Sequence, residues 1–95
     1  MAPVIERKLS QKTPQYSMNA AMDMATRIRV ARQRTGMTQR ELAARMHVTR
    51  NAVANWELNA RPNPSLSHLV RLATTLSISL EWLATGRGEM VIASE

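Results

Sequence analysis

Apolar residues recur at intervals of three and four through the middle of the chain, the spacing of one face of an α-helix. Met24, Ile28 and Ala31 share such a face, and Gly36 is predicted to end that segment. Helix-starting and helix-breaking residues follow at short intervals up to Leu83, which favours several short helices over a few long ones. No segment alternates for long enough to form a sheet. The pattern predicts an all-α fold, a compact bundle of five short helices.

Capping residues mark the second and third predicted helices. Thr38 and Glu41 have the spacing of a capping box, in which each side chain accepts a hydrogen bond from the other residue's backbone N–H. Thr49 is the predicted N-cap of the third helix. The residues expected to point inward from these two helices are Leu42, Ala43, Met46, Val53 and Trp56. Those expected to point outward from the third helix are Arg50, Asn51, Ala54 and Asn55.

A loop is predicted between Asn59 and Pro64, because two prolines within three positions forbid a continuous helix. Asn63 is then the expected N-cap of the fourth helix, with Pro64 in its first position. Ser79 is predicted to start the fifth helix and Gly86 to end it. The apolar face expected on the fourth helix consists of Leu66, Leu69, Val70, Ala73 and Leu76.

The two ends of the chain differ from its middle. Residues 1–22 contain two prolines and no sustained period, so we expect a flexible N-terminal arm there. Residues 23–87 form the predicted folded domain, and residues 88–95 the expected C-terminal tail, in which 90–92 are apolar enough to pack or pair. A length of 95 residues fits this single domain.

The charge favours a polyanionic partner. Thirteen Lys and Arg residues against seven Asp and Glu residues give a net charge of +6, which suits nucleic acid or an anionic membrane. Every basic residue between 23 and 87, histidine aside, is arginine, whose planar fork suits bidentate contacts to phosphate and guanine. A GC-rich genome would produce the same bias, and composition alone does not separate the two explanations.

Several classes of protein are disfavoured. No apolar run approaches the roughly 20 residues that span a bilayer, and the first 22 residues lack the apolar stretch of a secretory signal. The absence of cysteine excludes disulfides and Cys-based zinc sites, and fits the cytoplasm. His47 and His68 have no carboxylate or thiol arranged around them, so no metal site is expected. Without a nucleophile–base pair or clustered carboxylates we expect neither an enzyme nor a cofactor.

The strongest functional pattern runs from residue 39 to residue 57. Its two predicted helices are joined by a turn at His47 and Val48 that is too short for an antiparallel hairpin, so the helices must cross steeply. Ala43 is small enough for the crossing point, and Val48 and Val53 are the expected apolar anchors. This is a helix-turn-helix, whose second helix has the right size for the major groove of DNA.

The chain resembles, over roughly residues 24–88, the phage-repressor and Cro type of helix-turn-helix domain, the XRE-like family. The matching stretches are RIRVARQRTGMTQRELAARM, TRNAVANWE, RPNPSLSHLVRLATTLSIS and SLEWLATG. Two departures stand out. His47 occupies the position of the usual turn glycine, where a left-handed backbone is often needed. Leu58 and Asn59 replace the usual Asn/Arg-Gly, so the loop after the third helix is expected to differ in shape.

The resemblance implies roles for individual residues. The positions that contact base edges are Arg50, Asn51 and Asn55, for which an ordinary solvated helix face is the alternative. The positions that contact or neighbour the DNA phosphates are Thr38, Gln39, Thr49, Asn59, Arg61 and Arg32. Arg32 and Glu57 match a buried ion pair of the family. The pairing surface of the family places a dimer interface at Leu80, Trp82 and Leu83.

Two functions remain open from the sequence. The first is a sequence-specific regulator of transcription that binds double-stranded DNA, a repressor acting as a homodimer on a pseudo-palindromic operator. The second is an antitoxin-type interaction module, which binds a partner toxin through residues 1–22 or the C-terminal tail and regulates its own operon. A membrane-surface role lacks an apolar insertion face.

Overall fold

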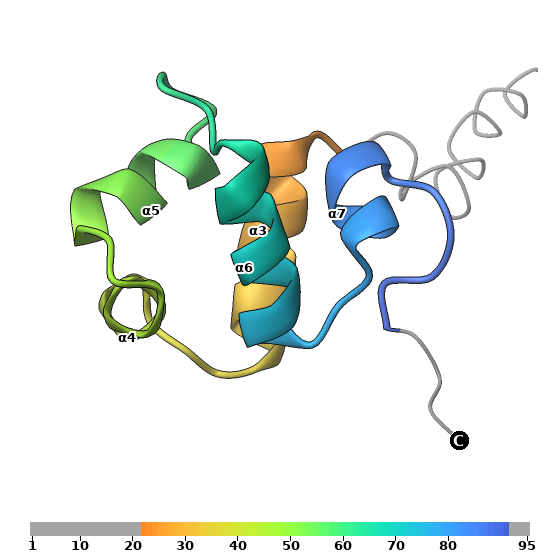
Figure 1. The fold of residues 1–95 in the computed structure, drawn as a ribbon, viewed down its shortest axis with the longest axis horizontal. Helices are drawn as coiled ribbons and strands as arrows, with labels where there is room; N and C mark the ends of the chain where they lie inside the picture. Colours follow the sequence, from red (N-terminus) through yellow and green to blue (C-terminus); the bar gives the residue numbers. More distant parts are fainter. Residues whose placement is uncertain (1–21, 92–95) are drawn as a thin grey trace, which may run out of the picture.

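A computed structural model describes residues 22–91, and this part of the chain contains helices and loops only. The five helices are α3 (Met24–Arg34), α4 (Gln39–Met46), α5 (Arg50–Glu57), α6 (Leu66–Leu76) and α7 (Leu80–Thr85). Figure 1 shows α3 and α6 at the centre, with α4 and α5 on one side of them and α7 on the other. The predicted all-α bundle of five short helices is confirmed. The arm expected at residues 1–22 lies, apart from its last residue, outside the described residues.

Local capping explains where four of the helices begin. The capping box at the start of α4 is formed in both directions, since Glu41 N–H donates to Thr38 Oγ1 at 3.0 Å and Thr38 N–H donates to Glu41 Oε1 at 2.8 Å. Asp23, Thr49 and Ser79 each accept a hydrogen bond from the backbone N–H three residues ahead, and thereby cap α3, α5 and α7.

The start of α6 differs from the prediction. Ser65, not Asn63, is the N-cap, and the helix begins at Leu66. Ser65 Oγ accepts a hydrogen bond from the His68 N–H at 3.1 Å, and His68 Nδ1 accepts one from the Ser65 N–H at 3.3 Å. The reciprocal pair satisfies two backbone donors at once, which a cap at Asn63 would leave unpaired. Pro64 was expected in the first position of this helix, and that prediction was wrong as well, since Pro64 precedes the helix.

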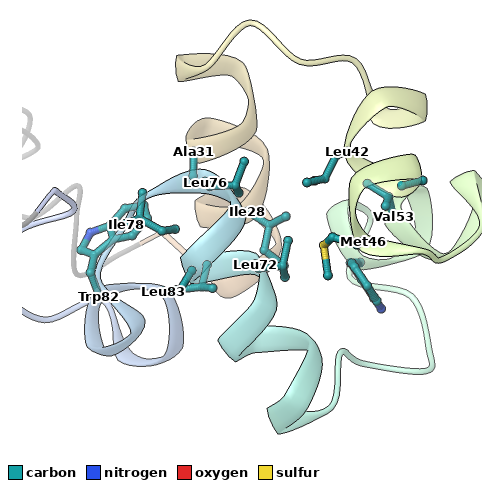
Figure 2. Close-up of a cluster of buried hydrophobic side chains, with 13 residues drawn as sticks. Ile28, Ala31, Leu42, Met46, Val53, Leu72, Leu76, Ile78, Trp82 and Leu83 are labelled. Carbon is teal, nitrogen blue, oxygen red and sulfur yellow. The ribbon is translucent and has the colours of Figure 1, made fainter.

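One hydrophobic core runs through the bundle, and Figure 2 shows its side chains converging between the helices. The buried apolar residues are Ala25, Ile28, Ala31, Leu42, Ala43, Met46, Val53, Trp56, Leu72, Ala73, Leu76, Ile78, Trp82 and Leu83. The expected inward residues of α4 and α5 are all among them. On α6 the expected face was wrong in part: Leu72 is buried, whereas Leu66 and Val70 are 71% and 44% exposed.

Three arginines hold the ends of helices. Arg27 of α3 is buried and donates to the carbonyl oxygens of Leu83 at 3.0 Å, of Ala84 at 3.4 Å and of Met22. Arg34 donates to the Leu76 carbonyl at 2.8 Å and Arg71 to the Met46 carbonyl at 2.7 Å. Leu83, Ala84, Leu76 and Met46 lie in the last turns of α7, α6 and α4, where carbonyls have no partner within their own helix. Arg27 and Arg34 therefore have a structural role in the bundle.

The segment after α7 folds back along the bundle. Met90 is half-buried against the core, and its carbonyl oxygen accepts a hydrogen bond from the Ser79 N–H at 2.8 Å. This contact ties the beginning of the expected tail to the start of α7. Within residues 22–91, the structure contains no helix with the length and apolar character that crossing a membrane requires.

Candidate nucleic-acid interface

The turn between α4 and α5 sets the angle between them. His47 adopts a left-handed backbone, with φ 58° and ψ 42°, and ends α4. The N–H of Val48 donates to the Ala43 carbonyl at 3.0 Å, and the Val48 side chain packs against the core. Ala43 is buried. The chain therefore changes direction within three residues, and Figure 1 shows α5 leaving α4 at a steep angle.

The two sides of α5 differ in exposure. Val53 and Trp56 are buried in the core, which fixes the rotation of the helix about its own axis. On the opposite side Arg50 and Asn51 are exposed in the first turn, and Asn55 is half-buried one turn further along. Arg50 and Asn51 thus present their polar groups to solvent from a helix whose other face is held in place. Such an arrangement is suited to reading base edges in the major groove.

Glu57, the last residue of α5, joins three helices. Its carboxylate accepts two hydrogen bonds from Arg32 of α3, Nε to Oε2 at 2.6 Å and Nη2 to Oε1 at 2.9 Å. Gln39 Nε2 of α4 donates to Oε1 at 3.1 Å. Arg32 Nη1 also donates to the Met37 carbonyl at 2.8 Å, in the loop before α4. This carboxylate cluster of Arg32, Gln39 and Glu57 fixes α3, α4 and α5 relative to one another.

The carboxylate cluster is shielded from solvent. The side chains of Arg32 and Glu57 are 11% and 3% exposed. The hydrogen bond to Glu57 raises the pKa of Arg32 above its ordinary value, so the guanidinium stays charged. The guanidinium of Arg32 thus donates to Glu57 and to the Met37 carbonyl, which gives it a structural role.

The other residues expected near phosphates lie at the surface around α4 and α5. Thr38 and Thr49 are exposed, and each uses its hydroxyl oxygen to cap a helix, which leaves the hydroxyl hydrogen free to donate. Gln39 is half-buried at the first position of α4. Asn59, in a left-handed conformation with φ 59°, and Arg61 are exposed in the loop after α5. Thr38 and Gln39 thus lie at the start of α4, before α5 in the chain, and Asn59 and Arg61 follow α5.

A pocket of about 260 Å³ lies beside this exposed face. Its walls come from α5, the loop after it and the first turn of α6, and consist of Thr49, Asn51, Ala52, Asn55, Trp56, Pro62, Asn63 and His68. The rings of Trp56 and His68 lie 4.9 Å apart, centroid to centroid, at 48° to each other. Asn63 and His68 were not among the predicted site residues. Ser65 and His68 have the spacing of a capping box, which could have pointed to His68 in the sequence. The pattern was missed because the second residue of an ordinary capping box is Glu or Gln, not histidine.

The residues expected at a dimer interface are placed differently from the prediction. Trp82 and Leu83 are 0% exposed, because both fill the core between α7 and the rest of the bundle (Figure 2). Their side chains cannot touch a second copy while the fold is intact. Of the three predicted residues only Leu80, 37% exposed, lies at the surface of the described chain.

Comparisons with known proteins agree with this geometry. A family model described as helix-turn-helix matches residues 28–83, which begin within α3 and end within α7. The HTH-type transcriptional regulator ImmR of Bacillus subtilis (strain 168) is 31% identical over 62 residues. That alignment covers 65% of this chain and 48% of the relative, so the chain spans about half the length of ImmR. The family match includes both helices of the motif and the three that support them, and the chain belongs to the XRE-type helix-turn-helix family.

Proposed function

We propose that this chain regulates transcription by binding double-stranded DNA sequence-specifically, with α5 in the major groove. The observation that carries the proposal is the exposure of Arg50 and Asn51 on a helix whose opposite side is locked by Val53 and Trp56. In this role Arg50 pairs with the O6 and N7 atoms of a guanine, and Asn51 or Asn55 with the N6 and N7 atoms of an adenine.

Phosphate contacts from both sides of α5 hold the helix in register in this proposal. Gln39 and Thr38 lie at the N-terminus of α4, where free backbone N–H groups and the helix dipole favour an anion. Thr49 lies at the start of α5, and Asn59 and Arg61 follow it. Contacts of this kind fix orientation and affinity and carry no direct sequence information.

We further propose a repressor that acts as a homodimer on a pseudo-palindromic operator. One short helix reads few base pairs, so selectivity against a genome of competing sites calls for two copies. Two-fold symmetry would place the half-sites about 34–36 Å apart, one turn of the duplex. Leu80 at the surface of α7 is the expected residue of the contact between copies.

Selection of bound duplexes from a random pool, followed by gel shifts at several salt concentrations, tests the proposal. A recurring sequence with two symmetric half-sites is the expected result. Arg87→Ala is a suitable control, because Arg87 is exposed and follows α7 in the chain, and α7 lies on the other side of the bundle from α5 (Figure 1). This variant should select the same sequence as the unaltered chain. A pool that remains random after selection would refute sequence-specific binding.

A further inference from the structure

His68 is held in one ring orientation in the first turn of α6. Its Nδ1 atom accepts a hydrogen bond from the Ser65 N–H at 3.3 Å, and its ring lies against that of Trp56, with the two centroids 4.9 Å apart. A ring nitrogen that accepts a hydrogen bond carries no hydrogen, so the hydrogen of the neutral ring is on Nε2. Within residues 22–91 the one buried side-chain nitrogen or oxygen without a partner is Trp82 Nε1. The Nε2 atom of His68 has no partner there either, so it is in contact with solvent.

His68 is also one of the residues that line the pocket beside α5. The pocket combines the amides of Asn51, Asn55 and Asn63 with the apolar surface of Trp56, and none of the side chains that line it with His68 ionises. A polar and apolar mixture of this kind is suited to the sugar–phosphate backbone of DNA, whose deoxyribose is largely apolar and whose phosphate accepts hydrogen bonds. The Nε2–H group of His68 is a donor that such a phosphate could use.

The width of α5 explains why a backbone and not a base would meet His68. A helix with its side chains is about 10–12 Å across and the major groove is about 12 Å wide, so a helix in the groove has a sugar–phosphate backbone along each side. The pocket lies at the side of α5, between this helix and the first turn of α6. In the proposed function a phosphate of the adjacent strand therefore lies opposite the pocket.

We infer that His68 is a pH-dependent phosphate contact, which makes DNA binding tighter as the pH falls through the range in which histidine titrates. The inference rests on the proposed function and adds to it a residue and a dependence on pH. A phosphate beside Nε2 stabilises the charged imidazolium, so the complex binds a proton more tightly than the free chain does. By linkage the proton then strengthens DNA binding to the same extent.

The imidazole ring can take up this proton without leaving its place. Ser65 Oγ lies 3.1 Å from Nδ1, so a protonated Nδ1 donates to that oxygen where the neutral Nδ1 accepted from the Ser65 N–H. The ring thus stays beside the pocket in both charge states. Protonation changes the charge that the pocket presents to a phosphate and leaves the position of the ring unchanged.

The charged residues nearest to His68 in the chain and on the neighbouring elements do not titrate in the same range. Arg71, three positions ahead on α6, donates to a carbonyl of α4. Glu57, next to Trp56 on α5, belongs to the carboxylate cluster, and Arg61 is exposed in the loop. Arginine and glutamate ordinarily titrate outside the range from about pH 5.5 to about pH 8. A response of DNA affinity within this range is therefore expected from histidine.

DNA affinity measured at about pH 8 and about pH 5.5, at constant salt and on the duplex that the unaltered chain selects, tests the inference. The unaltered chain should bind about tenfold more tightly at the lower pH for each copy bound, the worth of a hydrogen bond to a charged group. In His68→Gln the response should fall below about twofold, because glutamine keeps the capping box with Ser65 but does not titrate.

His47→Asn is the matched control, because His47 is the other histidine of the chain. It is exposed and left-handed, a conformation that asparagine tolerates, so this variant should fold and keep the full response to pH. The α-amino group also titrates in this range, but it is common to all three proteins and cannot produce a difference between them.

A response that His68→Gln retains, or that His47→Asn loses, would overturn the inference while the proposed function stands. Failure of the unaltered chain to select any duplex at either pH would instead overturn the proposed function, and the inference with it. If His68→Gln does not fold, the ring signals of His68 in NMR spectra of the unaltered chain provide a second measurement. They should report the imidazolium form up to a higher pH with the duplex than without it, and identical titrations would contradict the inference.

Discussion

Arg71 on α6 donates a hydrogen bond to the carbonyl oxygen of Met46, the last residue of α4, at 2.7 Å. The contact joins two residues that are 25 positions apart in the chain and satisfies a carbonyl that α4 itself leaves unpaired. Arg34 does the same for α6, and Arg27 for α7. Long planar guanidinium groups thus connect the ends of helices that are too short to be stable alone.

Replacing Arg27 by lysine tests this connecting role. Arg27 donates from separate nitrogens to carbonyls of α7 and of the segment before α3, and a lysine ammonium has a single nitrogen to serve both. Burial lowers the pKa of Arg27, since the charged form loses hydration there. Arg27→Lys should reduce the free energy of unfolding by about 1–3 kcal/mol, measured by urea denaturation. The exposed Arg87→Lys is the matched control, and equal stability of the two variants would contradict the role.

Removal of one member of the buried ion pair should reduce the free energy of unfolding more than Arg27→Lys does. Glu57→Ala leaves the guanidinium of Arg32 buried with its charge uncompensated, so the free energy of unfolding should fall by about 3–5 kcal/mol in a thermal melt. The paired replacement Arg32→Met with Glu57→Leu removes both charges and should lose much less. An unchanged melting temperature for Glu57→Ala would show that the pair contributes no stability.

Arg50→Ala should alter base preference and leave the fold intact. Arg50 is exposed at the first position of α5, and its side chain makes no contribution to the core. The variant should lose about 1–3 kcal/mol of discrimination at one base pair of each half-site, as measured by repeating the selection. Equal weakening on every sequence would move Arg50 from base reading to phosphate contact.

Arg61→Ala should have the opposite signature. Arg61 is exposed in the loop after α5, where a phosphate contact would be indifferent to sequence. Binding to specific and unrelated duplexes should weaken alike, and the slope of log affinity against log salt should become shallower by about 1. A slope equal to that of the unaltered chain would remove Arg61 from the set of phosphate contacts.

Acid should destabilise α3 through its N-cap. Hydrogen bonds from Thr26, first from its side chain and then from its backbone N–H, hold the pKa of Asp23 below its ordinary value of 3.8. A carboxyl with a lowered pKa in the folded state stabilises the fold above the ordinary value and loses that contribution as the pH falls through the lowered value. Asn caps helices without titrating, so Asp23→Asn should lose less stability between about pH 5 and about pH 3 than the unaltered chain. If Asp23→Asn and the unaltered chain lose the same stability as the pH falls, Asp23 is not the source of the acid sensitivity.

Predictions from the sequence succeeded where the physical cause is local. Thr38, Thr49 and Ser79 cap helices through backbone groups three residues away, so the chain itself contains the signal. Ser65 was missed because His68 performs the part usually played by Glu or Gln. The apolar residues of α4 and α5 were likewise placed correctly from their spacing alone.

Contacts between distant segments could not be predicted in the same way. The position of Arg27 depends on carbonyls 56 and 57 residues ahead, and no periodicity marks such a pairing. Trp82 was assigned to a dimer interface from the pairing surface of the family, and only the packing of α7 against the bundle shows that its side chain belongs to the core. The Gln39–Glu57 hydrogen bond joins two residues that the sequence had given separate roles.

The arginines that hold helix ends also bear on the thermodynamics of DNA binding. From the net charge of +6 alone, about six condensed cations would be expected to leave the duplex when one copy binds. Arg27 is buried against carbonyl oxygens and the charge of Arg32 is paired with that of Glu57. Cation release depends on contacts between charges and phosphates, so in the proposed function the number of cations released by each copy should follow the exposed arginines around α4 and α5 and not the overall composition.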